Sequence, residues 1–242
     1  HGMWHGAWCW HLWRELFAEW GWETIAHSLP GHANSPVQRP LAACTLDYYL
    51  SFLKAEVERL PRKPVLMGHS MGGALTQWYL KYVGDDLPAA VLVAPWTSHS
   101  MFKDNLVRVF KLDPLCYPLM MLTWDARPMV RNPYRAARAL ISPQALYSPQ
   151  DLHARLGSES VLVLYQHNPP FWSPPANLTT PLLWLAGEKD AVIGEAAQRR
   201  SAQYYGAEYV VVEGAGHNLM MEPSYQETAQ TIHNWLLKQG IE

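Results

Sequence analysis

The sequence of 242 residues lacks any dense run of basic side chains. Charged residues make up 17% of the chain and the formal net charge is −2. Proteins that bind nucleic acid usually carry a basic stripe for the phosphates, so we expect no nucleic-acid partner. Cysteine is also scarce, with Cys9, Cys44 and Cys116 far apart. That spacing fits neither a disulfide framework nor a zinc site and predicts a reducing, cytoplasmic setting.

Long apolar runs are missing as well. No segment reaches the ~20 residues that a membrane-spanning helix needs, and no secretory signal peptide is visible. We therefore expect no membrane span. Hydrophobic residues nevertheless make up 49% of the chain, with 12 Trp and 12 Tyr. This length and composition suit one α/β domain with an insertion, and they leave open whether it is a monomer or a homodimer.

Helix-like and strand-like segments alternate over residues 1–95 and again over 178–242. Helical spacing of apolar residues predicts helices over about 10–20, 46–60, 71–83, 195–205 and 224–238. Apolar runs predict strands over 22–27, 64–67, 88–95, 181–187 and 209–212. Such alternation with short connections predicts an α/β fold, a mostly parallel sheet covered by helices on both faces.

The alternation stops between residues 96 and 177, where Pro-interrupted, helix-like pieces predominate. We predict that this segment is a helical cap inserted into a core formed by 1–95 and 178–242. Residues 161–167 are ambiguous between helix and strand. No strand precedes the opening His1-Gly2 loop, so one edge of the 64–67 strand should lack a partner. We accordingly expect that one to three N-terminal strands precede His1.

Gly68-His69-Ser70-Met71-Gly72 is a G-x-S-x-G pattern between a predicted strand and a predicted helix. In that setting the pattern predicts a sharp, strained turn that exposes a nucleophilic serine, and its two glycines allow close packing. The alternative is an ordinary glycine-rich turn in which Ser70 caps the helix. His69 should point away from the serine and serve a structural role.

A nucleophilic serine needs a base and a group that orients the base. Loops after the carboxyl ends of parallel strands meet at one edge of the sheet. One such loop carries His217 between glycines and an apolar run, and another carries Glu188 and Asp190. We predict His217 as the base and favour Asp190 over Glu188 as the orienting acid. The order serine, acid, histidine is that of nucleophile-elbow hydrolases.

Acyl transfer also needs N–H donors for the developing oxyanion. The backbone N–H of Met71 follows the nucleophile directly, and the loop His1-Gly2-Met3 offers the N–H of Met3 as the second donor. His1, His5 and His11 match no metal-binding spacing and have no carboxylate cluster beside them, so we expect no metal and no cofactor.

These motifs together resemble the α/β-hydrolase superfamily. They stand in the family's order: His1-Gly2, Leu29-Pro30-Gly31-His32, Gly68-His69-Ser70-Met71-Gly72, Gly187-Glu188-Lys189-Asp190 and Gly214-Ala215-Gly216-His217. The resemblance is to small Ser-His-Asp, esterase/lipase-like members with a helical cap. Dehalogenases and epoxide hydrolases of this fold have Asp at the position of Ser70, and plant hydroxynitrile lyases have Lys at that of Asn218, so both departures favour ester hydrolysis.

The expected activity is therefore hydrolysis of a small to medium, fairly apolar carboxylic ester, thioester or lactone through an acyl-enzyme on Ser70. The alternatives are a cofactor-free lyase or perhydrolase on the same triad, and a ligand-binding receptor or pseudoenzyme. Met and aromatic side chains suit an apolar, adaptable acyl pocket. The candidates for its lining are Trp4, Trp96, Met101, Met121 and Trp124.

Overall fold

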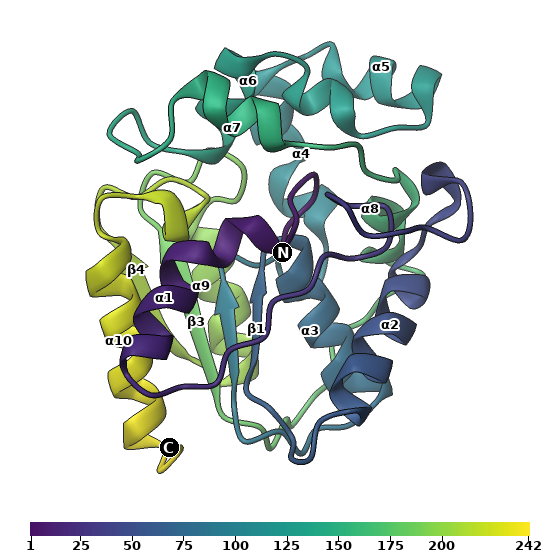
Figure 1. Ribbon diagram of the computed structural model, residues 1–242. Helices are drawn as coiled ribbons and strands as arrows, with labels where there is room; N and C mark the ends of the chain where they lie inside the picture. Colours follow the sequence, from purple (N-terminus) through teal and green to yellow (C-terminus); the bar gives the residue numbers. More distant parts are fainter.

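Four parallel strands form the central sheet of the computed structural model, which describes residues 1–242 (Figure 1). The strands lie in the order β1 (Leu66–His69), β2 (Ala90–Val93), β3 (Leu182–Gly187) and β4 (Glu208–Val212). Leu66 pairs with Ala90, Ala90 with Leu182, and Leu183 with Glu208. β2 and β3 are buried along their whole lengths, as their continuous apolar runs predict.

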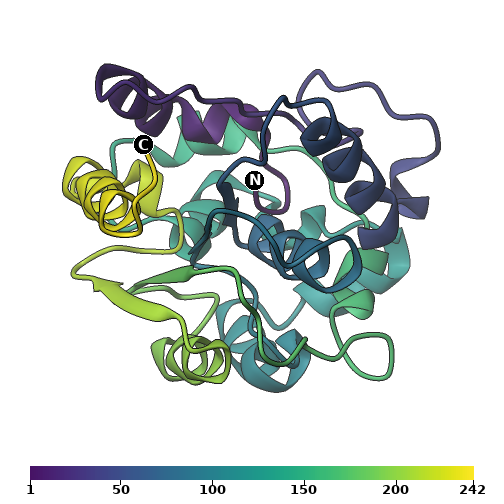
Figure 2. The ribbon, with the colours of Figure 1, turned by 90° about the horizontal axis from the view of Figure 1, so that it is seen from below.

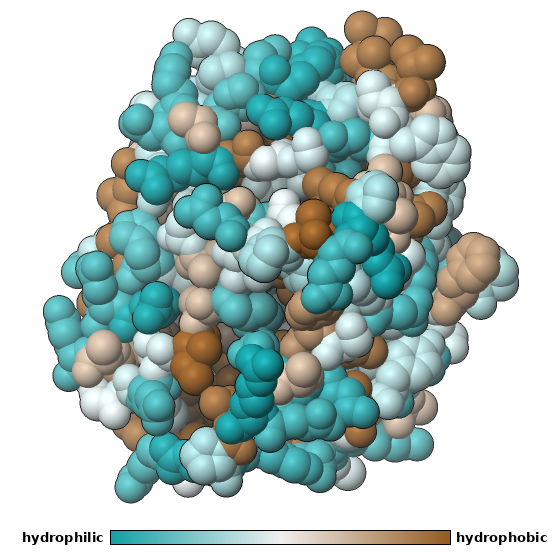
Figure 3. All heavy atoms as spheres, turned by 45° about the vertical axis from the view of Figure 1, so that its right-hand side comes forward, coloured by the Kyte–Doolittle hydropathy of each residue, from teal (hydrophilic) through white to brown (hydrophobic).

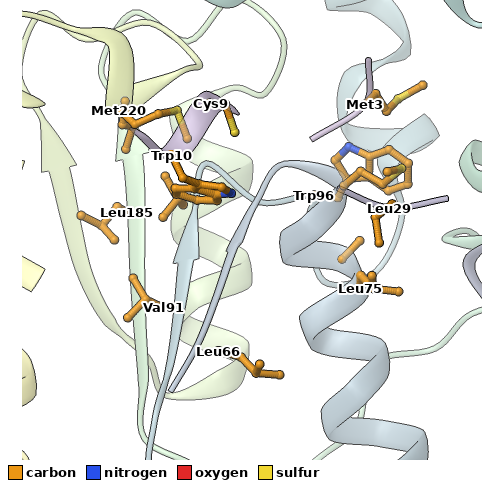
Figure 4. Close-up of a cluster of buried hydrophobic side chains, with 14 of the residues drawn as sticks. Met3, Cys9, Trp10, Leu29, Leu66, Leu75, Val91, Trp96, Leu185 and Met220 are labelled. Carbon is orange, nitrogen blue, oxygen red and sulfur yellow. The ribbon is translucent and has the colours of Figure 1, made fainter. Parts of the chain in front are cut away.

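Helices cover both faces of the sheet, which confirms the predicted α/β architecture. On one face α1 (His11–Glu19) packs against α10 (Tyr225–Lys238), and on the other lie α3 (Met71–Tyr82) and α9 (Glu195–Tyr205) (Figure 2). α2 (Leu46–Glu58) packs beside α3. Short 3₁₀ helices are η1 (Ala7–Trp10), η2 (Leu41–Ala43) and η4 (Leu219–Met221). Buried side chains from the sheet, α3 and the N-terminal loop form one core cluster (Figure 4).

The segment between β2 and β3 is helical. It contains α4 (Met101–Leu112), α5 (Cys116–Thr123), η3 (Arg127–Val130), α6 (Pro133–Leu140), α7 (Pro149–Arg155) and α8 (Leu162–Gln166). α5, α6 and α7 lie above the carboxyl ends of the strands (Figure 1). The end of the segment lies beside the core, because α8 packs on α2 and Trp172 stacks on Trp78 of α3 at 5.5 Å. The stretch 161–167, whose sequence is ambiguous between helix and strand, contains the helix α8.

Two strand predictions need adjustment. Residues 22–27 join no sheet, although they follow α1 as expected. β1 begins at Leu66 and continues to His69, directly before the serine. β1 pairs only with β2, so its other edge has no strand partner, as predicted. The longest helix, α10, has 14 residues, and no helix combines the length and apolarity needed to cross a membrane.

A buried ion pair connects the 29–32 loop to the segment between β2 and β3. His32 Nε2 lies 2.9 Å from Glu159 Oε2, and neither side chain is exposed. The Tyr49 hydroxyl donates to the other Glu159 oxygen at 2.8 Å. Burial opposes protonation of His32, but the Glu159 carboxylate and the hydrogen bonds to Glu159 and Pro30 outweigh it, so the pKa of His32 is raised.

Replacing Glu159 with glutamine should lower the free energy of unfolding by about 3 kcal/mol near pH 6, because it removes one partner of a buried pair. Because the pKa of His32 is higher in the folded than in the unfolded protein, the pair stabilises the fold fully at pH values below the unfolded pKa of about 6.5. This stabilisation disappears as the pH rises through the pKa of His32 in the folded protein. The loss should therefore be clearly smaller at about pH 9.

Denaturant unfolding of both proteins at the two pH values measures this difference. Asp86→Asn, which removes one partner of the exposed Lys63–Asp86 pair, is the control and should change stability little at either pH. An equal loss for Glu159→Gln at both pH values would contradict a charged His32.

Candidate active site

Ser70 is the single residue between the end of β1 and the start of α3. Its backbone has φ 53° and ψ −116°, a conformation that costs a non-glycine residue about 1–3 kcal/mol. Ser70 occupies the N-cap position of α3, but its hydroxyl makes no capping hydrogen bond, so the side chain does not serve as an ordinary helix cap. The turn is the strained one that the motif predicts.

The two glycines of the motif allow the backbone to pack closely around this turn. A Cβ on Gly68 would lie 2.3 Å from the carbonyl oxygen of Gly72, and a Cβ on Gly72 would lie 2.7 Å from that of His1. Both distances are too short for a carbon–oxygen contact. A side chain at either position would therefore displace the turn or the N-terminal loop.

Three side chains from separate loops form a continuous chain of hydrogen bonds. His217 Nε2 lies 2.9 Å from Ser70 Oγ, and His217 Nδ1 lies 2.7 Å from Asp190 Oδ2. All three residues are buried. They meet because β1, β3 and β4 are parallel and their carboxyl ends lie at the same edge of the sheet. In this geometry the imidazole can take the serine proton while the carboxylate fixes its tautomer.

The structure separates the two candidate acids. Asp190 Oδ1 accepts hydrogen bonds from the N–H groups of Val192 and Ile193 at 2.8 and 2.9 Å, which leaves Oδ2 directed at His217. Glu188 is exposed and accepts from the N–H of Gly214. Only Asp190 therefore reaches the imidazole.

His69, expected to be structural, contacts the back of the His217 loop. Its Nε2 lies 3.2 Å from the carbonyl oxygen of His217, a distance at which an N–H donates to that oxygen. Burial, followed by the nearby His217 and His5 rings, holds the pKa of His69 well below its usual range. His69 is therefore neutral and helps to fix the position of the His217 backbone.

Sequence reasoning missed a second support of this loop, Glu222. This fully buried carboxylate accepts from the N–H of Gly216 at 3.0 Å and from the N–H of Ser142 at 2.8 Å. It thus connects the turn before His217 to the end of α6. The available signal was a glutamate directly after the apolar run Leu219–Met221, where a charge needs partners to be buried.

The N-terminal loop packs directly on the serine turn. A Cβ on Gly2 would lie 2.9 Å from Ser70 Cβ and equally close to the His69 ring. The backbone N–H groups of Met3 and Met71 donate no hydrogen bond among the backbone bonds of the loops and helix caps. Met3 also lines the same pocket as Ser70. Both N–H groups are therefore available for an oxygen bound beside the serine.

The N-terminal histidines use their rings within the protein. His1 Nε2 accepts from the N–H of Leu29 at 3.0 Å, and His5 Nε2 lies 3.0 Å from the Asn218 amide. Burial lowers the pKa of His5 to about 3, so its ring is neutral. His11 is exposed at the surface, and its Nδ1 lies 3.1 Å from the carbonyl oxygen of Trp8. The three rings do not converge on one point where a metal could bind.

A narrow pocket borders Ser70 and His217. Its other lining residues are Met3, Trp4, Trp96, Met101, Phe102, Asn105, Val109, Tyr117, Met129, Leu140, Leu164 and Val192. Three of the predicted lining residues, Trp4, Trp96 and Met101, are among them. Figure 4 shows Met3 and the Trp96 indole beside each other near the upper end of α3.

Met121 and Trp124 do not line this pocket, which corrects the prediction for them. They are 41% and 55% exposed. α5 is apolar on every side, so its sequence does not identify the inner face; Cys116 and Met120 are the buried residues. Figure 3 shows hydrophobic side chains gathered at the upper right of the molecule, the part of the top on which α5 lies in Figure 1.

Comparisons with known proteins agree with this fold. A sequence model described as "Alpha/beta hydrolase family" matches residues 1–231. "Putative esterase/lipase 2" of Mycoplasma pneumoniae is 24% identical over 214 residues, which cover 84% of this chain and 75% of the relative.

Two solved structures are similar over nearly the whole chain. The monoacylglycerol lipase of Paleococcus ferrophilus has a TM-score of 0.72 at 19% identity, covering 99% of this chain and 92% of that one. An esterase from Exiguobacterium antarcticum has a TM-score of 0.73 at 14% identity, covering 98% and 90%. At these identities the likeness concerns the fold.

Proposed function

This chain belongs to the alpha/beta hydrolase family, and from that premise we propose that it is a carboxylic-ester hydrolase with Ser70, His217 and Asp190 as its catalytic triad. The observation that carries the proposal is the unbroken hydrogen-bond chain from Asp190 through His217 to Ser70. An oriented imidazole beside a serine hydroxyl is the arrangement that makes a weak nucleophile reactive. The name of the sequence relative, "Putative esterase/lipase 2", supports the same class.

The proposed reaction has two halves. His217 takes the proton of Ser70 as the hydroxyl oxygen attacks the ester carbonyl, and the tetrahedral oxyanion accepts hydrogen bonds from the Met3 and Met71 N–H groups. His217 then gives its proton to the departing alcohol, which leaves an acyl-Ser70 ester. In the second half His217 takes a proton from water, the resulting oxygen attacks the acyl carbon, and return of the proton to Ser70 releases the acid.

The substrate is proposed to be small to medium in size, with an apolar acyl chain. Most side chains around Ser70 are aliphatic, aromatic or methionine, and such a lining removes apolar groups from water. Methionine is unbranched and adapts to ligands of different shape. The proposed pocket therefore accepts a range of acyl chains.

A fluorophosphonate probe should react with the enzyme at Ser70, and mass spectrometry of the digested protein identifies the labelled residue. Labelled protein should lose hydrolysis of 4-nitrophenyl butyrate in proportion to the label, because one serine carries out every turnover. Protein denatured before labelling is the control, since an unfolded serine has no base beside it. Absence of label from Ser70 in the folded protein would refute the proposal. Labelling without multiple turnovers would instead favour a receptor.

A further inference from the structure

One side chain in the pocket has a polar atom without a partner. Asn105 of α4 lines the pocket and is 2% exposed. Its amide nitrogen donates to the carbonyl oxygen of Met101 at 3.1 Å, which identifies the other amide atom as Oδ1. Oδ1 is buried and has no hydrogen-bond partner. Most buried polar atoms in proteins are hydrogen-bonded, so this exception calls for an explanation.

A second unpartnered polar group belongs to the N-terminal loop. The Trp4 indole lines the same pocket, and its Nε1–H is buried without an acceptor. The Trp4 backbone has φ 64°, and its carbonyl accepts from the N–H of Gly157 at 2.8 Å. The pocket therefore offers one free donor and one free acceptor among mostly apolar side chains.

We propose that Asn105 and Trp4 form a subsite for a hydroxyl group of the ester substrate. A hydroxyl is the small group that donates and accepts through one oxygen, so it can donate to Asn105 Oδ1 and accept from Trp4 Nε1–H. A keto oxygen would satisfy the indole alone, and an ammonium would satisfy the amide alone. The preferred substrates are thus hydroxy esters. This inference rests on the proposed ester hydrolysis at Ser70.

Two matched substrate pairs locate the hydroxyl. For the acyl side the pair is 4-nitrophenyl 3-hydroxybutyrate and 4-nitrophenyl butyrate; for the alcohol side it is 2-hydroxyethyl butyrate and propyl butyrate. The wild-type kcat/KM should favour the hydroxylated member of one pair by about tenfold or more, since the plain ester leaves both buried groups unpaired. Asn105→Leu and Trp4→Phe should each move that ratio toward one. The double variant should lose less than the two single losses combined, because both groups bind one oxygen.

Asn234→Leu makes the same substitution at an exposed position of α10 and should keep the wild-type ratio. Calorimetric binding of the same esters to Ser70→Ala protein repeats the comparison without turnover, with a preference of about tenfold expected. Equal binding and equal kcat/KM within both pairs, or ratios unchanged by both pocket variants, would overturn the subsite. A binding preference without wild-type hydrolysis would support the subsite and refute the hydrolase, so the two failures are distinguishable.

Discussion

Replacing Ser70 with alanine should lower kcat for hydrolysis of 4-nitrophenyl butyrate by about 10,000-fold or more. The variant keeps the pocket and the free N–H groups of Met3 and Met71, but it loses the oxygen that lies 2.9 Å from His217 Nε2. No other hydroxyl is hydrogen-bonded to that nitrogen, so no acyl-enzyme can form. Steady-state release of nitrophenol measures the loss, and circular dichroism verifies that the variant is folded.

Ser51→Ala is the matched control. Ser51 is an exposed serine of α2 whose hydroxyl donates to the Tyr48 carbonyl. This variant should hydrolyse the ester at the wild-type rate. Turnover by Ser70→Ala within about tenfold of the wild type would exclude Ser70 as the nucleophile.

Replacing Asp190 with asparagine should lower kcat by about 10,000-fold while preserving the fold. The Val192 and Ile193 N–H groups should retain the amide oxygen in place of Oδ1, so the amide NH₂ would face His217 Nδ1. That nitrogen must then accept a hydrogen bond, which moves the ring proton to Nε2. His217 would present a donor to Ser70 and could no longer take its proton.

Glu188→Gln tests the other acid of the same loop. Glu188 lies at the surface and only accepts from the Gly214 N–H, so kcat should stay within about threefold of the wild type. Steady-state rates for the two variants decide between the acids. If Glu188→Gln lost activity and Asp190→Asn retained it, the assignment of the triad acid would have to be reversed.

The local sequence was sufficient to predict those structural features that depend only on residues close together in the chain. Continuous apolar runs identified β2 and β3 because a strand buried on both faces tolerates few polar side chains. The glycines around Ser70 identified the strained turn, since only residues without a side chain allow the approach seen at Gly68. The order of the strands then indicated which loops share an edge.

Tertiary structure decided what depends on distant contacts. The sequence favoured Asp190 over Glu188 only by its place in the loop, and the N–H groups that hold Asp190 Oδ1 are what turn its other oxygen toward His217. α5 has no polar face, so packing alone placed Met120 inside and Met121 outside. Residues 22–27 have a strand-like pattern but no ladder partner.

The position of the proposed nucleophile was therefore predictable from the sequence itself, because backbone sterics within five consecutive residues favour a turn with Ser70 at its apex. The surroundings of that nucleophile were not. Glu222, which holds the turn before His217, and the pocket residues Asn105 and Trp4 come from segments far apart in the chain. Glu222 has hydrogen-bond partners, and Asn105 Oδ1 and Trp4 Nε1 have none, because of the way in which the segment between β2 and β3 packs over the sheet. No local sequence pattern encodes that packing.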